Sequence, residues 1–290
     1  MSGTGRAGKM NIVETIKLAS NYLEGKGVPS PRLNAELLLA KALGCSRLDL
    51  YLRFDEVPLS EAMERFKSDL RLRAKRYPIQ YITGSVEFYS LPFKIIEGVF
   101  IPRPETELLV EWAEESMDGM KDVRFVEFGV GSGIISGTLA KRNDSWRGVA
   151  VDISRDAVTL ARENIEALGV SERVSLILSD GFDSIRCDGG FDLLVANPPY
   201  IPGGAIPDLQ PEVSGYEERS ALDGGPDGLR FYPAIVNEGM RLLSKGGVAI
   251  VEIGQGEEKG VKEMFVEGGY SVVDVRKDYN GLERLVRGVK

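Results

Sequence analysis

From about Arg124 to the C-terminus, strand-like runs alternate with helical ones. The strand-like runs read, in chain order, "RFVEFG", "GVAVDI", "RVSLILSD", "FDLLVAN", "VAIVEIG" and "YSVVDVRKD". The helical runs between several of them read "GIISGTLAKR", "SRDAVTLARENIEALG", "GLRFYPAIVNEGMRLL" and "GEEKGVKEMFVEGG". Because alternating strands and helices are typical of sheets with crossover helices, this part predicts an α/β fold with a doubly wound, mostly parallel sheet.

The first part of the chain carries helical patterns only. The first pattern places apolar residues on one helix face: Ile12, Ile16, Ala19 and Leu23. A second helix is predicted to start with Ser30 as N-cap and Pro31 at its first position, and to end at Gly44. A third has an apolar stripe made of Leu59, Met63, Phe66 and Leu70.

The third helical pattern ends in a basic cluster, which consists of Lys67, Arg71, Arg73, Lys75 and Arg76. One interpretation is a solvated face whose positive charge is favourable at a helix C-terminus. The other is a docking patch for an acidic or RNA-bound partner. The sequence leaves both open.

Between these parts lies an aromatic and β-branched stretch that is broken by Gly84, Pro92 and Gly98. It predicts short strands or a hairpin that joins two domains. We therefore expect four segments: a disordered lead-in (1–10), a helical N-terminal domain for substrate recognition (11–78), a β-hairpin linker (79–100) and a catalytic domain (101–290).

Composition excludes several classes of protein. The 290 residues are 43% hydrophobic and 28% charged, which is typical of a soluble globular protein. No run of about 18 apolar residues is present, so no membrane span is predicted, and we expect a cytoplasmic protein. Cys45 and Cys187 predict neither a disulfide framework nor a metal site. The chain has no histidine, which excludes a His-based triad or zinc site, and its net charge of −8 disfavours a general nucleic-acid binder.

The first predicted strand of the sheet ends in a glycine loop, with Gly129, Gly131 and Gly133 in GxGxG spacing. Such glycines let the backbone turn sharply and let a ligand lie against it, at the usual ligand edge of an α/β sheet. By itself, the loop is equally compatible with a tight strand-to-helix turn.

Acidic residues end the next two strands. Asp152 follows Gly129 by 23 residues and can accept both hydroxyls of a ribose, while Asp180 can accept from an adenine amino group. Each acid alone could be a helix N-cap. Together with the glycine loop they predict a nucleoside pocket, and because no P-loop motif is present, S-adenosylmethionine fits best.

The fourth strand ends on Asn197, Pro198, Pro199 and Tyr200. The prolines fix φ and have no N–H, so the tip is stiff and its carbonyls stay free as acceptors. A planar –NH₂ group could donate to the Asn197 side-chain oxygen and the Pro198 carbonyl, with Tyr200 as an aromatic wall. This arrangement would position the nitrogen for attack on an electrophile without any histidine. The alternative is a rigid strand terminator.

This tip after a GxGxG strand resembles amino-methyltransferases of DNA, RNA and protein. Six motifs together resemble one family, the protein-(glutamine-N5) methyltransferases of peptide chain release factors (PrmC/HemK): "QYITGSVEFY", "IPRPETELLVE", "VANPPYIP", "ALDGGPDGL", "VEIGQGE" and "DYNGLERLV". The resemblance extends over almost the whole chain from about residue 11.

The resemblance implies a class I methyltransferase domain with a seven-stranded, mostly parallel sheet whose last strand is antiparallel. It implies methyl transfer from S-adenosylmethionine, without a metal, to the glutamine of the Gly-Gly-Gln motif in bacterial release factors 1 and 2. No direct nucleic-acid substrate and no membrane are expected, and we expect a monomer. Asn197, Pro198, Pro199 and Tyr200 would hold the glutamine amide.

The expected cofactor-binding residues are Phe100, Arg103, Glu127, Gly129, Gly131, Gly133, Asp152, Ile153, Asp180, Gly181, Phe182 and Asn197. Two departures from the family pattern stand out. Glu218 replaces the usual proline of a Glu-Pro-Arg loop, and Glu127 is longer than the commoner aspartate. The rival interpretations are a DNA or RNA amino-methyltransferase, which predicts a basic face over the pocket, and a non-catalytic protein that keeps an adenosyl pocket.

Overall fold

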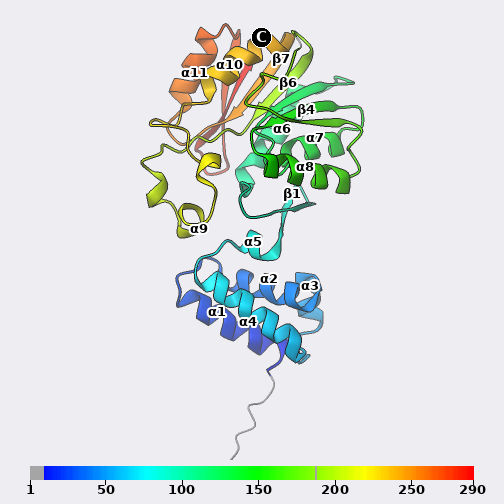
Figure 1. Cartoon of the computed structure of the whole chain (residues 1–290), viewed down its shortest axis with the longest axis vertical. Coiled ribbons are helices and arrows are strands. Elements are labelled where there is room, and N and C mark those ends of the chain that lie inside the picture. The colour runs from blue at the N-terminus through cyan, green and yellow to red at the C-terminus, as the bar shows by residue number, and fades with distance from the viewer. Residues whose placement is uncertain (1–9, 187) are drawn as a thin grey trace, which may run out of the picture. The chain divides into compact units, whose positions relative to one another are not determined.

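The computed structural model describes residues 10–186 and 188–290 (Figure 1). The expected lead-in falls almost wholly on residues 1–9, and Cys187 also lies outside the described residues. The chain divides into two compact units. The helical unit comprises the chain as far as Gly84 together with Pro211–Tyr216, and the sheet unit comprises Ser85–Gln210 and Glu217–Lys290.

The helical unit packs short helices around one apolar core. Its helices are α1 (Ile12–Glu24), α2 (Pro31–Leu43), α3 (Arg47–Leu52), α4 (Ser60–Ala74), α5 (Ile79–Thr83) and α9 (Pro211–Ser214). Asn11 and Glu14 form a capping box that starts α1. As predicted, α2 begins at Pro31 and is followed by Gly44 as its C-cap, but Ser30 at the N-cap position makes no side-chain capping bond. Phe66 of α4 is buried, but the prediction for Leu59 is wrong: it is 79% exposed, because it lies at the N-cap of α4.

The basic cluster at the end of α4 is not simply a solvated face. Arg73 is buried, and it donates to Glu212 Oε1 over 2.7 Å and to Asn34 Oδ1 over 2.6 Å. Arg76 donates to both oxygens of Glu212, over 2.7 and 2.5 Å. Two of the five basic residues therefore act inside the helical unit, as partners of one largely buried carboxylate.

The linker region contains both a helix and a hairpin. Residues 79–83 form α5 rather than a strand, and Gly84 ends this helix in the left-handed conformation. The antiparallel hairpin that follows, β1 (Ser85–Phe88) with β2 (Leu91–Lys94), belongs to the sheet unit.

The sheet unit is built on seven strands in the order β5-β4-β3-β6-β7-β9-β8. The strands are β3 (Arg124–Phe128), β4 (Arg147–Asp152), β5 (Val174–Leu178), β6 (Phe191–Ala196), β7 (Leu243–Glu252), β8 (Val272–Lys277) and β9 (Glu283–Val289). The first five are parallel, and β9 is antiparallel to both β7 and β8. The six predicted strands are present, and β9 was missed.

Helices cover both faces of this sheet (Figure 1). On one face lie α6 (Glu107–Ser116), α7 (Ile134–Arg142) and α8 (Arg155–Ala167), and on the other α10 (Tyr232–Leu242) and α11 (Glu258–Glu267). Neighbouring strand residues alternate between the two cores, so Phe125 packs in the first and Val126 in the second. The strand order reverses between β3 and β6, which is where ligands bind in open α/β sheets.

Candidate active site

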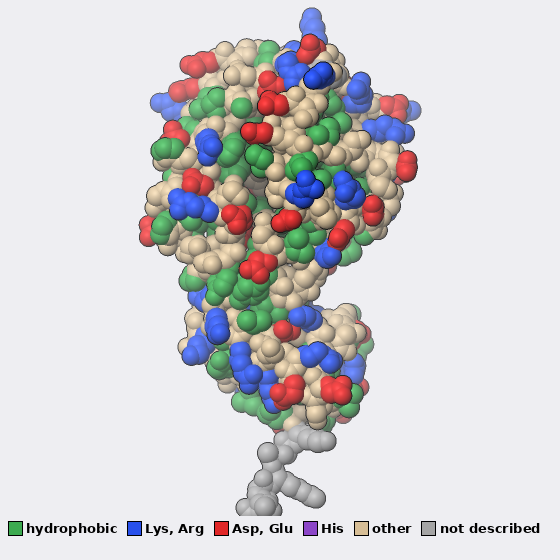
Figure 2. Space-filling model, viewed as in Figure 1, with side chains coloured by type: hydrophobic (Ala, Val, Ile, Leu, Met, Phe, Trp, Pro, Cys, Tyr) green, Lys and Arg blue, Asp and Glu red, His purple; other side chains and the backbone are tan. Residues whose placement is uncertain are grey.

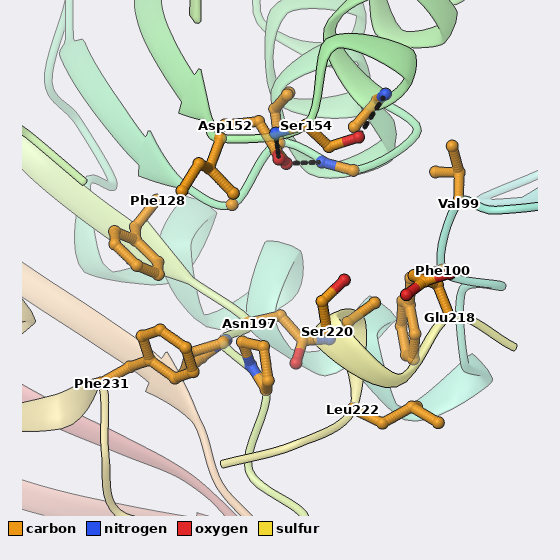
Figure 3. A pocket seen from close by; sticks show the side chains of 18 of the residues that line it. Val99, Phe100, Phe128, Asp152, Ser154, Asn197, Glu218, Ser220, Leu222 and Phe231 are labelled. Carbon is orange, nitrogen blue, oxygen red and sulfur yellow. Dashed lines mark hydrogen bonds between the residues drawn. The ribbon is translucent and has the colours of Figure 1, made fainter. Parts of the chain in front are cut away.

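A cavity of about 640 Å³ lies at the carboxyl ends of β3, β4 and β6. Figure 3 shows Asp152 and Ser154 on one side of it and Asn197 and Phe231 on the opposite side. Most of the predicted site residues line this cavity: Phe100, Arg103, Glu127, Gly129, Gly131, Asp152, Ile153, Asp180, Gly181, Asn197, Pro198, Pro199 and Tyr200. Gly133 and Phe182 are not among its lining residues.

The glycine loop after β3 meets the cavity through Gly129 and Gly131, whose φ angles are 73° and 53°. A Cβ atom added to either residue would meet no neighbouring atom within 4 Å, so the backbone conformation demands glycine here. Gly133 differs, because a Cβ atom there would lie 3.0 Å from the Cβ atom of Ala161 in α8. Gly133 therefore allows close packing behind the loop, and its expected place beside the cofactor stays a prediction.

Asp152 at the end of β4 holds the loop in place. Its Oδ2 accepts from the backbone N–H of Gly131 over 2.9 Å, and its Oδ1 accepts from that of Ser154 over 2.8 Å. Burial raises the pKa of Asp152, and these backbone bonds oppose that rise. A carboxylate has about four lone-pair sites, so both oxygens can still accept from ribose hydroxyls.

Glu127 in β3 is buried, yet it lines the cavity. Its Oε2 accepts from the backbone N–H of Ser136 over 3.0 Å and from the Ser136 hydroxyl, whereas Oε1 has no hydrogen-bond partner among the residues that the structure describes. Burial raises the pKa of Glu127 to about 8. An unpaired buried carboxylate oxygen is costly, so it is suited to a cationic ligand group.

Aromatic rings form one wall of the cavity. Phe128 and Phe231 line it, with ring centroids 6.0 Å apart (Figure 3). Phe182 packs behind them, 5.5 Å from the Phe128 ring and only 3% exposed. Phe182 thus supports the wall through Phe128, and its expected direct place at the cofactor stays a prediction.

The segment before α6 contributes Phe100 and Arg103. The Arg103 guanidinium lies 4.9 Å from the centre of the Phe100 ring, and it donates to Glu217 Oε1 over 2.5 Å. The buried Glu217 also accepts from the backbone N–H of Ile101 over 3.3 Å. Glu218 lines the cavity with φ −65°, the value that a proline ring imposes, so glutamate here is compatible with the loop shape of the family.

The tip after β6 stands beside the glycine loop, because β6 pairs with β3, with Ala196 opposite Phe128. The Asn197 amide Nδ2 donates to the Thr106 hydroxyl over 3.1 Å. That hydroxyl donates to Glu252 Oε2 over 2.8 Å, and the Tyr200 hydroxyl donates to Glu252 Oε1 over 3.2 Å. Burial raises the pKa of Glu252 to about 7.

Thr106 and Glu252 were missed as site residues by the sequence analysis. They lie in "IPRPETELLVE" and "VEIGQGE", two of the motifs that carry the family resemblance. Thr106 lies between Glu105 and Glu107, and Glu252 between Val251 and Ile253, so neither gives a chemical signal of its own. The only available signal was that both lie in family motifs.

Two family models match the chain: the PrmC N-terminal domain over residues 14–84, and the methyltransferase small domain over residues 101–209. Among solved structures, the T. thermophilus 16S rRNA N2 G1207 methyltransferase in complex with AdoMet and guanosine has a TM-score of 0.54. It is 20% identical, covering 71% of this chain and 49% of that one. A methyltransferase from Pyrococcus furiosus has a TM-score of 0.52 at 17% identity, covering 70% and 90% of the two chains. These likenesses show the methyltransferase fold.

Curated relatives match along nearly the whole chain. The release factor glutamine methyltransferase of Geobacter sulfurreducens is 42% identical, covering 96% of both chains. That of Rhodopirellula baltica is 36% identical, covering 99% of this chain and 98% of the relative. A methyltransferase sheet, a helical N-terminal unit of the PrmC type and identity of this extent lead to one conclusion: the chain belongs to the release factor glutamine methyltransferase family.

Proposed function

We propose that this protein transfers a methyl group from S-adenosylmethionine to the side-chain nitrogen (N5) of the Gly-Gly-Gln glutamine in bacterial release factors 1 and 2. The family and the names of its members support the reaction class. The observation that carries the proposal to individual residues is the oriented Asn197 amide. Its Nδ2 is bound to Thr106, which leaves its oxygen available to an –NH₂ group in the cavity.

The cavity residues fit the cofactor. The unpaired Oε1 of buried Glu127 suits the ammonium group, Asp152 the ribose hydroxyls and Asp180 the adenine amino group. Gly181 and Ile153 line the same part of the cavity, and Phe128 supplies an apolar wall. When bound, S-adenosylmethionine supplies an electrophilic methyl group on a positively charged sulfur.

The tip residues position the nucleophile. The Asn197 oxygen and the Pro198 carbonyl each accept one N–H of the glutamine amide, and Tyr200 limits its movement. Their negative partial charges stabilise the positive charge that develops on the nitrogen as it gains the methyl group. No strong base is required, because the nitrogen becomes acidic only at that stage and its proton leaves afterwards.

We assign release factor recognition to the helical unit, which matches the PrmC N-terminal domain. No helix in the described part of the chain is long and apolar enough to cross a membrane. We propose that the protein acts in the cytoplasm, where release factors work. Its state as a monomer stays a prediction.

Incubation with radiolabelled S-adenosylmethionine and purified release factor tests this function. Label should enter the release factor and should be lost when the glutamine of its Gly-Gly-Gln motif is changed to alanine. Label that survives this change would refute the substrate assignment. The same release factor with a different surface glutamine changed serves as the matched control.

A nucleic-acid amino-methyltransferase is the rival function. The charged residues that line the cavity are mixed and more often acidic: Glu127, Asp152, Asp180, Glu218 and Asp223, against Arg103, Arg219 and Arg230. On the face that Figure 2 shows, acidic and basic side chains are likewise interspersed within each unit. A phosphate backbone needs a basic surface, so these charges favour a protein substrate.

A further inference from the structure

Asn197 can serve as an acceptor only if its amide is turned the right way. A side-chain amide has an oxygen that accepts and an –NH₂ that donates, on opposite corners of one plane. The glutamine nitrogen of the proposed function is itself a donor. If Asn197 presented its own –NH₂ to the cavity, two donors would face each other, so the choice of face decides whether the tip works.

The Thr106 hydroxyl determines that choice. A hydroxyl has a single hydrogen, and Thr106 donates it to Glu252 Oε2 over 2.8 Å. Toward Asn197 the hydroxyl can then only accept, so it selects the Nδ2 corner, which lies 3.1 Å away. The opposite corner, Oδ1, is thereby left for the cavity that Asn197 lines.

The charge of Glu252 determines the direction of the whole chain of bonds. An ionised carboxylate is an acceptor only, so it requires the hydrogens of both hydroxyls, those of Thr106 and Tyr200. Thr106 and Glu252 are each only 1% exposed, so the hydrogen bond between them is shielded from bulk solvent. A proton on Glu252 Oε2 could instead be donated to Thr106, which would free the Thr106 hydrogen for the Asn197 oxygen and favour the reversed amide.

We propose that Thr106 and Glu252 are positioning residues, which fix the Asn197 amide with its oxygen toward the substrate nitrogen through one directed chain of hydrogen bonds. The inference rests on the proposed function, because it concerns the acceptor side of that reaction. It also gives the Tyr200 hydroxyl a role, since its hydrogen is directed to Glu252 Oε1.

The surroundings of Glu252 make this device sensitive to pH. Burial raises the pKa of Glu252 to about 7, with a smaller contribution from Glu105, while Thr106, Tyr200 and Arg284 favour the ionised form. Tyr232 donates to the backbone carbonyl of Glu252 over 2.9 Å. Below about pH 7 the protonated form grows, so the fraction of correctly turned Asn197 should fall as pH falls.

Three variants test the chain of bonds. Thr106→Val keeps the shape but removes the hydroxyl, and should lower kcat about 100-fold, the magnitude typical of losing one aligned polar group. Thr106→Ser restores the hydroxyl and should recover activity to within about fivefold of the wild type. The glutamine of Glu252→Gln has only one accepting oxygen and cannot accept both hydroxyl hydrogens, so kcat should fall. Because its amide does not titrate, the loss of activity below about pH 7 should also disappear. The KM for S-adenosylmethionine should stay nearly unchanged in all three.

Thr138→Val in α7 is the matched control. The Thr138 hydroxyl is buried and has no hydrogen-bond partner, and Thr138 does not line the cavity. This control should keep wild-type kcat and the wild-type pH profile. A Thr106→Val enzyme with kcat within twofold of the wild type would overturn the inference, as would a Glu252→Gln enzyme with an unchanged acidic limb.

A measurement without turnover separates this inference from the proposed function. The ¹⁵N signal of the Asn197 side-chain amide, assigned by its loss in Asn197→Asp, should shift with a midpoint near pH 7 in the wild type. It should not shift in Glu252→Gln. If the wild type fails to label the release factor but this titration is observed, the function is wrong and the positioning chain stands. If labelling succeeds and the signal is independent of both pH and Glu252, the positioning chain is wrong. This readout also serves if Thr106→Val does not fold.

Discussion

The two halves of the cavity hold their polar groups in different ways. In the cofactor half, Asp152 is fixed by two backbone N–H groups. One belongs to Ser154, just after the strand of Asp152, and the other to Gly131 in the loop after β3. In the acceptor half, Asn197 is fixed by side chains, through Thr106 to Glu252, from segments 91 and 55 residues away in the chain. Backbone N–H donors do not depend on the chemistry of a side chain, whereas a chain of side-chain hydrogen bonds fails when one link is removed.

The largest effect on kcat should come from substitution of Asn197, the last residue in the chain of side-chain hydrogen bonds. Asn197→Asp replaces a neutral amide with an anion that cannot donate to Thr106, so kcat should fall about 1000-fold. The affinity for S-adenosylmethionine should stay within a few-fold of wild type, since Asp152 and Glu127 are untouched. Single-turnover labelling and calorimetry measure the two quantities. Full turnover in this variant would exclude Asn197 as the acceptor.

Substitution of Asp152, which accepts from the backbone N–H groups, should instead lower cofactor affinity and leave kcat nearly unchanged. Asp152→Ala removes the acceptor of two loop N–H groups and of the ribose hydroxyls, so cofactor affinity should fall about 10- to 100-fold, as for hydrogen bonds to a charged group. At saturating cofactor, kcat should remain close to wild type. Titration with S-adenosylhomocysteine provides the affinity. A variant that loses kcat with unchanged affinity would contradict the division into two halves.

Glu127, in the cofactor half, makes the stability of the folded protein depend on pH. Its pKa is raised by burial to about 8 in the folded state, so between about pH 4.5 and 8 the folded state binds more protons than the unfolded state. The stability that this group contributes is therefore greatest at low pH and is lost as pH rises through about 8. Relative to Glu127→Gln, the wild-type Tm should fall by about 7 °C between pH 5 and pH 9.

Cofactor binding should lower the pKa of Glu127, because an ammonium group beside Oε1 favours the ionised carboxylate. Near pH 7, wild-type binding should release a proton, which calorimetry in buffers of different ionisation enthalpy detects. Glu127→Gln should release none. Equal proton release by both proteins would place the ammonium group elsewhere.

The smallest effect should be at Glu218. Its φ of −65° is already that of proline, so Glu218→Pro should leave kcat within about twofold and raise Tm by about 1–2 °C through the unfolded state. Thermal unfolding and the labelling assay measure both. A large loss of activity would mean that the Glu218 side chain itself contacts a substrate.

The comparison of the two halves also explains how far the sequence could predict the site. Gly129 and Asp152 were predictable, because a glycine turn and a strand-end acid are local features with a fixed spacing. Thr106 and Glu252 were not, because their roles arise only when η1 (Pro104–Thr106) and β7 come together in the fold. At Gly133 the spacing matched the loop, and the structure adds a constraint that the spacing did not indicate, the contact with Ala161.

The same limit applies to the fold. The six predicted strands have apolar or β-branched runs that indicated them, while β9 was missed, although it is no more charged than β8. Arg73 and Arg76 were interpreted by charge alone, because their partner Glu212 lies more than 130 residues away. Pairings over such distances leave no local pattern to read.

The segment Pro211–Tyr216 limits how the coding sequence can be divided into parts that each encode a whole unit. The chain passes between its two units three times, at Gly84, at Gln210 and at Tyr216, so neither unit is one uninterrupted stretch of codons. A truncation that starts at Ser85 would remove Arg73 and Arg76 and leave the Glu212 carboxylate without them. Exchange of the recognition unit between relatives would therefore require two inserts, one for residues up to 84 and one for 211–216, taken from the same donor.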